Sequence, residues 1–275
     1  MDQSLPPGLY IVATPIGNLS DLSPRAAETL RRADLILAED KRVTAKLLAH
    51  AGAKAPMRTY HDHSSDADRQ RALDAIAVKA VALVSDAGTP LISDPGYKLV
   101  RAARAAGHSV FTIPGPCAAI AALTVAGLPT DRFLFAGFLP AKAKVRADAI
   151  ADLAAVKASL VFYESGPRLG ESLSDLASGL GDRDAAVVRE ITKLHEECVT
   201  GTLADLAERF DSPPRGEIVI VVGPPLQKEA TEADLDTALL QSLTENSPSR
   251  AAAEVATRLG VPKKRAYARA LELSR

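Results

Sequence analysis

Short apolar runs alternate with polar, glycine- and proline-rich turns along the first part of the chain. Four such runs have the length of buried strands, at residues 9–13, 35–38, 80–84 and 109–113, and Arg58-Thr59-Tyr60 is expected to form a further strand, the third along the chain. The segments between them are long enough for helices, and Ser23-Pro24 has the composition of a helix start. Strands that are each separated by a helix predict an α/β fold with a mostly parallel five-stranded sheet and right-handed crossovers.

The pattern of strands and helices changes in the second half of the chain. A helix is expected at residues 167–180, and the apolar runs predict strands at residues 133–137, 160–163, 185–188, 198–202 and 217–222. Because few helices separate the last three strands, this second sheet is expected to be mixed. The sequence thus predicts an N-terminal α/β domain (residues 1–118), a C-terminal α/β domain (119–226) with a mixed sheet, and a helical extension (230–275).

The segment SDAGTPLISDPG, residues 85–96, is the centre of the predicted site. It follows an apolar run, offers the carboxylates of Asp86 and Asp94, and contains glycines that let a ligand lie against the backbone. It has no lysine, so it is not a Walker-type phosphate loop. A ligand with hydroxyl groups and a positive charge suits it better than a polyphosphate.

Further polar clusters follow other predicted strands, at residues 14–19, 39–42 and 114–118. Because parallel strands end at one edge of a sheet, these clusters are expected to gather there, where open α/β sheets bind ligands. Taken alone, each cluster is better explained by a tight strand-to-helix turn without a ligand.

Overall composition narrows the class of protein. The 275 residues include 47% hydrophobic ones, and 33 Lys and Arg balance 34 Asp and Glu, so any nucleic-acid-binding surface must be local. The two cysteines, Cys117 and Cys198, fit a reducing cytoplasm better than a disulfide framework. No signal-peptide pattern is found in residues 1–8, and the apolar stretch 117–128 is too short to span a bilayer, so a cytoplasmic protein is expected.

Seven motifs occur together in a recognisable order. They are ATPIGNL (13–19), AED (38–40), SDAGTP (85–90), IPGPCA (113–118), GLPTDRF (127–133), FYES (162–165) and REITK (189–193). With these motifs the chain resembles the bacterial 16S rRNA (cytidine-2′-O)-methyltransferase family of the tetrapyrrole methylase superfamily, over about residues 8–222. It departs from the family's usual pattern at Lys41, where Thr is usual, and at SGPR (165–168), where Ser-Pro-His-Arg is usual.

This resemblance implies S-adenosylmethionine in a cleft between two α/β domains, a homodimer, and methylation of a cytidine ribose in the decoding centre of the 16S rRNA of the small ribosomal subunit. It implies neither a metal nor a membrane partner. His61-Asp62-His63 has metal-ligand residue types, but a hydrogen-bonded loop or a substrate contact explains it better. The cofactor-binding residues expected on the matching motifs are Pro15, Gly17, Asp86, Ala87, Gly88, Thr89, Pro114, Gly115, Cys117, Ala118 and Tyr163.

A ribose 2′-hydroxyl is weakly acidic, so a base, or a cation that stabilises the alkoxide, should help its methylation. The candidate catalytic residues in the matching motifs are Asp40, Glu164, Glu190 and Lys193. Lys193 could act electrostatically or, if desolvated, as a base, but it could also contact a phosphate or simply be solvated. Glu190 could pair with its neighbours, and Asp40 could serve as a charge at a helix N-terminus.

Basic residues expected on loops near the cleft indicate an RNA-binding surface. They are Arg25, Arg42, Arg132, Lys142, Lys144, Arg146 and Arg168. The tail has a weak helix-turn-helix pattern and could contact RNA, assist assembly, or pack on its own domain. Two alternative functions remain at this point: methylation of a corrin or porphyrin precursor, and a non-catalytic nucleic-acid-binding regulator that uses the tail.

Overall fold

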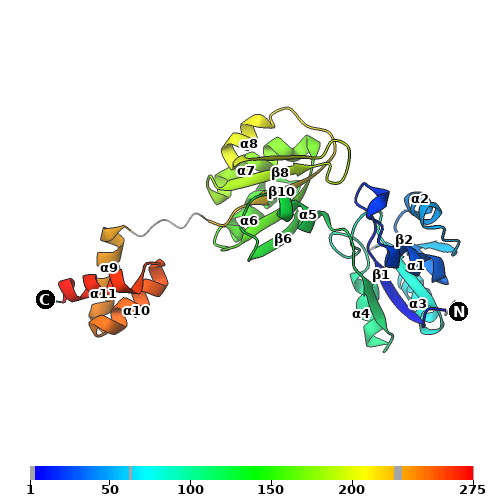
Figure 1. Ribbon diagram of the computed structural model, residues 1–275, viewed down its shortest axis with the longest axis horizontal. Helices are drawn as coiled ribbons and strands as arrows, with labels where there is room; N and C mark the ends of the chain where they lie inside the picture. The colour runs from blue at the N-terminus through cyan, green and yellow to red at the C-terminus, as the bar shows by residue number, and fades with distance from the viewer. Residues whose placement is uncertain (1–3, 62–63, 226–230, 275) are drawn as a thin grey trace. The chain divides into compact units, whose positions relative to one another are not determined.

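The computed structural model describes residues 4–61, 64–225 and 231–274. The chain divides into two compact units, residues 1–225 and 226–275 (Figure 1). The larger unit contains two five-stranded sheets. The described part of the smaller unit is helical.

The first sheet is wholly parallel, with strand order β3-β2-β4-β1-β5. Its strands are β1 (Gly8–Val12), β2 (Leu35–Ala38), β3 (Met57–Thr59), β4 (Ala80–Val84) and β5 (Val110–Ile113). Helices α1 (Pro24–Arg32), α2 (Lys41–Ala51), α3 (Asp66–Val78) and α4 (Tyr97–Ala105) connect them, with a 3₁₀ turn at Leu19–Asp21. The predicted parallel sheet is therefore confirmed.

Burial on both faces explains why the central strands β2 and β4 of this sheet are continuous apolar runs. Every residue of β4 is buried, and its side chains alternate between two clusters of apolar residues. Ala82 and Val84 pack in one cluster, and Val81 and Leu83 in the other. A parallel sheet covered by helices on both faces has this pattern.

The second sheet is mixed, with strand order β6-β7-β10-β8-β9. Its strands are β6 (Phe133–Phe138), β7 (Ser159–Ser165), β8 (Asp184–Arg189), β9 (Glu197–Thr202) and β10 (Glu217–Val222). Only the β6–β7 pair is parallel; the other three pairs are antiparallel. The mixed sheet predicted for this half of the chain is confirmed.

Helices cover both faces of the second sheet. They are α5 (Ala118–Val125), α6 (Ala143–Leu153), α7 (Leu169–Leu180) and α8 (Leu203–Arg209), with a 3₁₀ turn at Gly166–Arg168. Ala119 and Ala122 of α5 share a cluster with Val161 of β7. On the other face, Ile150 of α6 and Leu173 of α7 share a cluster with Phe162.

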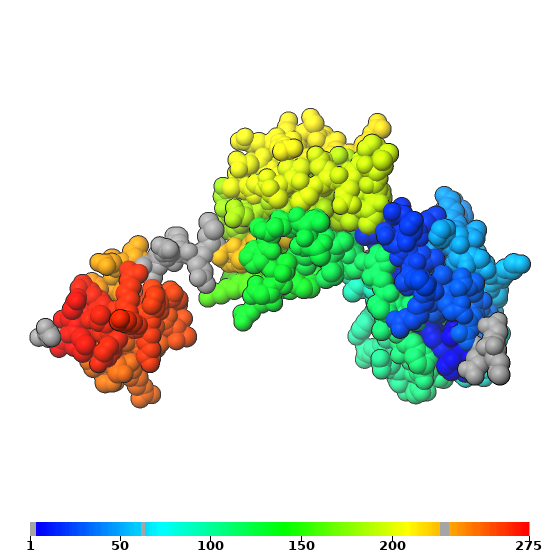
Figure 2. All heavy atoms as spheres, viewed as in Figure 1, coloured from blue at the N-terminus to red at the C-terminus, as the bar shows by residue number. Residues whose placement is uncertain are grey.

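Three helices make up the described tail: α9 (Glu232–Leu243), α10 (Pro248–Leu259) and α11 (Lys263–Leu273). They pack around a core of their own that includes Leu239, Val255 and Ala266, and Figure 2 shows them as one compact body. Gly260 ends α10 in the left-handed conformation, at φ 67°. The helical tail is confirmed, whereas the domain boundary at residue 118 remains a prediction.

Candidate active site

The turns that follow strands β1, β4 and β5 are tied to one another. Thr14 and Gly88 exchange two backbone hydrogen bonds, of 2.8 and 3.1 Å. The Thr89 hydroxyl donates to the carbonyl oxygen of Pro116 at 2.9 Å. These bonds hold three segments that are distant in sequence at one edge of the sheet, as the parallel topology requires.

The end of β2 joins the same group of turns. The Asp40 amide donates to the Asp86 carboxylate at 3.0 Å. The Asp40 side chain caps helix α2, and it accepts two hydrogen bonds from the Arg42 side chain and one from the Arg42 amide. The hydrogen bonds from the Arg42 side chain and amide lower the pKa of Asp40 to about 2. Asp40 is thus a firmly ionised helix cap, the alternative that the sequence left open.

A cavity of about 290 Å³ lies where these turns meet the second sheet. Its volume is close to the lower end of small-molecule sites, roughly 300–1,000 Å³. Six of the eleven predicted cofactor-binding residues line it: Ala87, Gly88, Thr89, Cys117, Ala118 and Tyr163. In the described residues no Lys, Arg or His side chain lines this cavity.

The other five predicted cofactor-binding residues lie beside the cavity lining in sequence. Pro15 and Gly17 flank Ile16, which does line the cavity. Pro114 and Gly115 precede the lining residue Cys117. The exposed Asp86 accepts the Asp40 amide rather than lining the cavity.

Tyr163 of β7 is fixed in the cavity wall by polar and aromatic contacts. Its hydroxyl oxygen accepts a hydrogen bond from the Ala119 amide at 3.2 Å, in the first turn of α5. Its ring packs edge-on to Phe135 and Phe138, with centroids 4.8 and 5.6 Å away. Burial raises the pKa of Tyr163, so the phenol stays protonated.

Three carboxylates line the cavity: Glu164, which the sequence offered as a catalytic candidate, and Asp94 and Glu217, which were not among the predicted site residues. Asp94 is half-buried, and desolvation, the largest cause, raises its pKa to about 6. Glu164 is buried and accepts hydrogen bonds from the Ser165 amide at 2.8 Å and the Ser172 hydroxyl at 2.6 Å. The sequence offered a signal for Asp94, its position in the segment 85–96, but none for its burial.

Lys193 and Glu190 form an ion-paired group outside the cavity lining. The Lys193 ammonium donates to Glu190 and to Glu217, both at 2.8 Å. Burial alone would lower the pKa of Lys193, but the hydrogen bonds to these carboxylates outweigh it, so the pKa is raised. Lys193 is therefore protonated near neutral pH, which favours its electrostatic role over the role of a base.

Gly17 brings the turn after β1 against this ion-paired group. A Cβ at residue 17 would lie 2.6 Å from Cγ of Lys193. Only a residue without a side chain permits this approach. The contact places Lys193 next to the predicted cofactor-binding turn.

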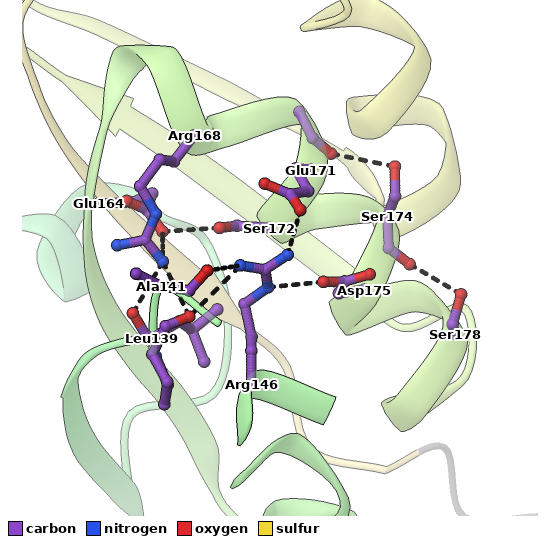
Figure 3. Close-up of polar contacts among 12 residues, drawn as sticks. Leu139, Ala141, Arg146, Glu164, Arg168, Glu171, Ser172, Ser174, Asp175 and Ser178 are labelled. Carbon is purple, nitrogen blue, oxygen red and sulfur yellow. Dashed lines mark hydrogen bonds and ion pairs between the residues drawn. The ribbon is translucent and has the colours of Figure 1, made fainter. Parts of the chain in front are cut away.

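Arg146 was expected on an RNA-binding loop, and this prediction is wrong. The segment is helical from Ala143, and Arg146 is 1% exposed. It forms an ion pair with Glu171 and donates to Asp175 at 2.6 Å and to the carbonyl oxygens of Pro140 and Ala141 (Figure 3). With its guanidinium enclosed by these partners, Arg146 is not available to a phosphate.

The other predicted RNA-binding residues differ in their surroundings. Arg168 donates to the carbonyl oxygens of Leu139 and Pro140, at 2.7 and 3.2 Å, and lies 3.5 Å from Glu164 (Figure 3). Arg42 is exposed but paired with Asp40. The remaining four are exposed: Arg25, Arg132, Lys142 and Lys144.

Metal-ligand residue types are scattered in the part of the chain that the structure describes. No three His, Cys, Asp or Glu side chains there are placed to hold a metal ion. Asp62 and His63, from the cluster noted in the sequence, lie outside the described residues.

Cys117 and Cys198 are both free thiols. No helix in the described ranges is long and apolar enough to cross a membrane.

Comparison with known families identifies the class of protein that these features define. Residues 8–207 match the tetrapyrrole (corrin/porphyrin) methylase family. Residues 229–274 match the RsmI C-terminal HTH domain, in the tail where the sequence indicated a helix-turn-helix. The chain belongs to the tetrapyrrole methylase family.

Within that family, similar curated proteins share a narrower name. "Ribosomal RNA small subunit methyltransferase I" of Erythrobacter litoralis is 55% identical over 98% of this chain and 97% of its own length. The proteins of that name from Mesorhizobium japonicum and Escherichia coli O157:H7 are 48% and 46% identical, over 98% and 96% of this chain and 93% and 94% of their own. The resemblance found in the motifs is confirmed.

Solved structures share the fold at low sequence identity. Uroporphyrin-III-C-methyltransferase from Thermus thermophilus has a TM-score of 0.57 and 21% identity over 79% of this chain and 94% of its own. A diphthine synthase has a TM-score of 0.61 and 17% identity over 78% of this chain and 89% of its own. At these identities the likeness shows the fold alone.

Proposed function

We propose that this protein transfers a methyl group from S-adenosylmethionine to the 2′-hydroxyl of a cytidine ribose in 16S rRNA of the small ribosomal subunit. The observation that carries the proposal is the cavity enclosed by the tied turns after β1, β4 and β5. Curated relatives that span nearly all of the chain are named as methyltransferases of small-subunit ribosomal RNA, which supports the choice of acceptor.

The chemistry of the cavity fits S-adenosylmethionine. Its lining offers close approach to backbone at Gly88 and Gly216, an apolar surface from Ile16 and Ile191, and carboxylates at Asp94 and Glu164. A nucleoside with a sulfonium and an ammonium group needs this mixture of flat apolar surface, backbone groups and negative charge. When bound, this cofactor supplies the electrophilic methyl group.

The chain's own part in the reaction is to position and polarise the acceptor. Holding a hydroxyl in line with the methyl group supplies much of the acceleration, because it replaces a bimolecular encounter with a fixed geometry. Lys193, protonated and packed against Gly17, is proposed to stabilise negative charge on that hydroxyl or on the adjacent phosphate. Glu190 holds the Lys193 ammonium in place.

RNA binding is assigned to the exposed basic residues and an aromatic side chain at the cavity mouth. Arg25, Arg132, Lys142 and Lys144 are proposed as phosphate contacts. Phe138, exposed and lining the cavity, offers a flat surface to an unstacked base. Arg168 is proposed to hold the segment after Phe138 rather than to touch phosphate, since it donates to the carbonyl oxygens of Leu139 and Pro140.

The active form is proposed to be a cytoplasmic homodimer. Helix α5 is apolar except for Thr124, and its Ile120 and Val125 side chains are exposed. Exposed apolar side chains of this kind are typical of protein interfaces. Light scattering on the purified chain tests this assignment, with a mass of about twice 28.9 kDa expected for a dimer.

The proposed function is tested by labelled-methyl transfer to small ribosomal subunits from a strain that lacks this methylation. Digestion of the product to nucleosides should give 2′-O-methylcytidine. Label on a base, or no label on the RNA, would reject the proposal. Transfer to a uroporphyrinogen acceptor in a parallel reaction would favour the corrin or porphyrin alternative.

A further inference from the structure

We propose that a second cavity of the larger unit, at the carboxyl ends of β2 and β3, binds a phosphate group of the RNA strand that carries the acceptor ribose. This inference rests on the function proposed above. It adds a substrate-binding site that is separate from the cofactor cavity and from the basic residues already assigned to RNA.

The second cavity has a volume of about 430 Å³. Three cationic side chains, those of Lys41, Arg58 and Arg71, line it together with a single carboxylate, that of Asp68. Its other lining residues are uncharged: Leu37, Thr59, Tyr60 and Ala72. The lining thus carries net positive charge, although the whole chain has a net charge of −1. This local excess of cations favours an anionic ligand.

The strand register explains how the cations come together. Arg58 of β3 lies opposite Leu37 of β2 in the parallel ladder, so the two side chains are on the same face of the sheet. Helix α3 covers that face, and its Ala72 shares an apolar cluster with Leu37. Arg71 precedes Ala72 on the helix, and Arg58 is exposed because β3 is an edge strand. The cavity therefore has a buried apolar floor and a cationic rim.

The cations of the rim are available to a further anion. In the described part of the chain, Lys41 and Arg58 take part in no ion pair. Arg71 pairs with Asp68, but these side chains are 65% and 41% exposed, and exposed pairs add little stability. Asp68 also accepts hydrogen bonds from the Ser65 hydroxyl and amide, so it keeps partners if Arg71 turns away. A phosphate suits this rim, because a guanidinium binds it through two parallel hydrogen bonds.

The two cavities of the larger unit have opposite charge. Asp94, Glu164 and Glu217 line the cofactor cavity, and among the described residues no cationic side chain does. That cavity suits a sulfonium and an ammonium group, but its carboxylates repel the phosphates on either side of the acceptor ribose. Those phosphates therefore need a cationic surface outside it, and the second cavity supplies one.

A short path through the structure joins the two cavities. The Asp40 amide donates to the Asp86 carboxylate at 3.0 Å. Ala87, next to Asp86, lines the cofactor cavity, and Lys41, next to Asp40, lines the second one. Bond lengths along this path limit the distance between the Cα atoms of Lys41 and Ala87 to about 16 Å. Because nucleotides rise about 3.4 Å each along a stacked strand, a few of them cover this distance.

The test measures binding of full-length variants to small ribosomal subunits that lack the methylation. Arg58→Gln should weaken binding about fivefold, and Arg58→Gln combined with Lys41→Thr about 20-fold. The slope of log affinity against log salt concentration should fall by about 0.7 in the double variant, the value for one phosphate contact on a single strand. Arg58→Lys, which keeps the charge, should retain most of the affinity.

A charge-matched control removes the same two kinds of cation elsewhere. Arg104 of α4 and Lys46 of α2 are exposed and line neither cavity. Arg104→Gln combined with Lys46→Thr should therefore change the affinity for subunits less than twofold.

Methyl transfer gives a second readout. The KM for subunits should rise in the double variant in proportion to the loss of affinity, while kcat at saturation stays within threefold. This split is expected of a contact that is made equally in the ground state and the transition state. The calorimetric affinity for S-adenosylmethionine should also stay within threefold, which shows that the variant is folded.

Subunit affinity within twofold of wild type in the double variant, or an equal loss in the charge-matched control, would overturn the proposal. Calorimetry with inorganic phosphate tests the other source of this anion. If the double variant lost phosphate binding but kept its affinity for subunits, the cavity would bind a free anion and not RNA. A wild type that binds S-adenosylmethionine but does not methylate subunits would reject the proposed function, whereas unaffected variants of an active wild type would reject only this inference.

Discussion

Burial acts on single ionisable side chains of the larger unit in two opposite ways. Arg146 is enclosed but surrounded by two carboxylates and two carbonyl oxygens, which satisfy its charge. Asp94 is half-buried beside other acidic groups, which disfavour its charge. The first arrangement stabilises the fold, whereas the second costs stability at neutral pH and is typical of functional groups.

Replacing Asp94 by Asn should therefore stabilise the protein at neutral pH. Because the folded-state pKa of about 6 exceeds the ordinary 3.8, protonation of Asp94 favours folding, and this contribution is lost as pH rises through about 6. Asn carries no charge to lose. Urea unfolding at pH 7.5 should show a gain of about 1 kcal/mol, a value reduced for solvent screening. The gain should shrink towards pH 4, and an equal difference at both pH values would show that the charge of Asp94 is not its cause.

Replacing Arg146 by Met should destabilise the larger unit. It would leave Asp175, Glu171 and two carbonyl oxygens without their cation. Loss of about 2 kcal/mol in the free energy of unfolding is expected, less than for a fully buried pair because both carboxylates reach solvent. Lys144→Met, on the exposed side of the same helix, is the matched control and should change stability by less than about 0.5 kcal/mol. Equal effects of the two substitutions would contradict the structural role of Arg146.

At the scale of elements, central strands such as β4 and β10 could be predicted because burial makes them nearly uninterrupted apolar runs. The helix that contains Arg146 was not predicted, because its residues do not show the apolar pattern of a helix packed on a sheet. Its buried position is occupied by an arginine, while Val145 beside it is exposed. The apolar side chains therefore do not mark the buried face of this helix. The buried charge of Arg146 is satisfied by carboxylates of α7, which are distant in sequence.

The turns of the candidate site were predictable in position but not in detail. Parallel strand order alone brings the turns after β1, β4 and β5 to one edge, and six predicted residues line the cavity. The partial burial of Asp94 was not predictable, because the cavity that it lines is also lined by Phe138 of β6 and Tyr163 of β7, which are distant in sequence. The pairing of Asp40 with Arg42 is local, and the sequence did leave that alternative open.

The hydrogen bond between the β4 and β5 turns should contribute to cofactor binding. Thr89→Val keeps the shape of the side chain but removes the hydroxyl that donates to Pro116. Loss of about 1 kcal/mol of stability and a several-fold weaker calorimetric affinity for S-adenosylmethionine are expected, because the two turns are no longer fixed together. Thr124→Val is the control, since that exposed hydroxyl only bonds Ala121 within α5. An unchanged affinity in Thr89→Val would show that this contact is not needed to shape the cavity.

At the scale of the whole molecule, the chain consists of two units with separate cores. The tail packs Leu239, Val255 and Ala266 against one another. Both sheets and the cavity belong to residues 1–225. Folding and cofactor binding are therefore expected to reside in the larger unit.

Ending the chain after residue 225 should leave the cofactor affinity within about threefold of the full chain, since the cavity is complete without the tail. Affinity for the small ribosomal subunit should fall if the tail contacts RNA. Calorimetry with S-adenosylmethionine and subunit binding, each measured on both forms, check this expectation. Complete loss of cofactor binding in a folded truncated protein would contradict it.

A crystal structure of the full chain with S-adenosylmethionine is the decisive measurement for the candidate active site. We expect cofactor density in the cavity lined by Gly88, Cys117 and Tyr163. Density at any other place, or a cavity that closes in the crystal while the cofactor binds elsewhere, would contradict the assignment of this cavity.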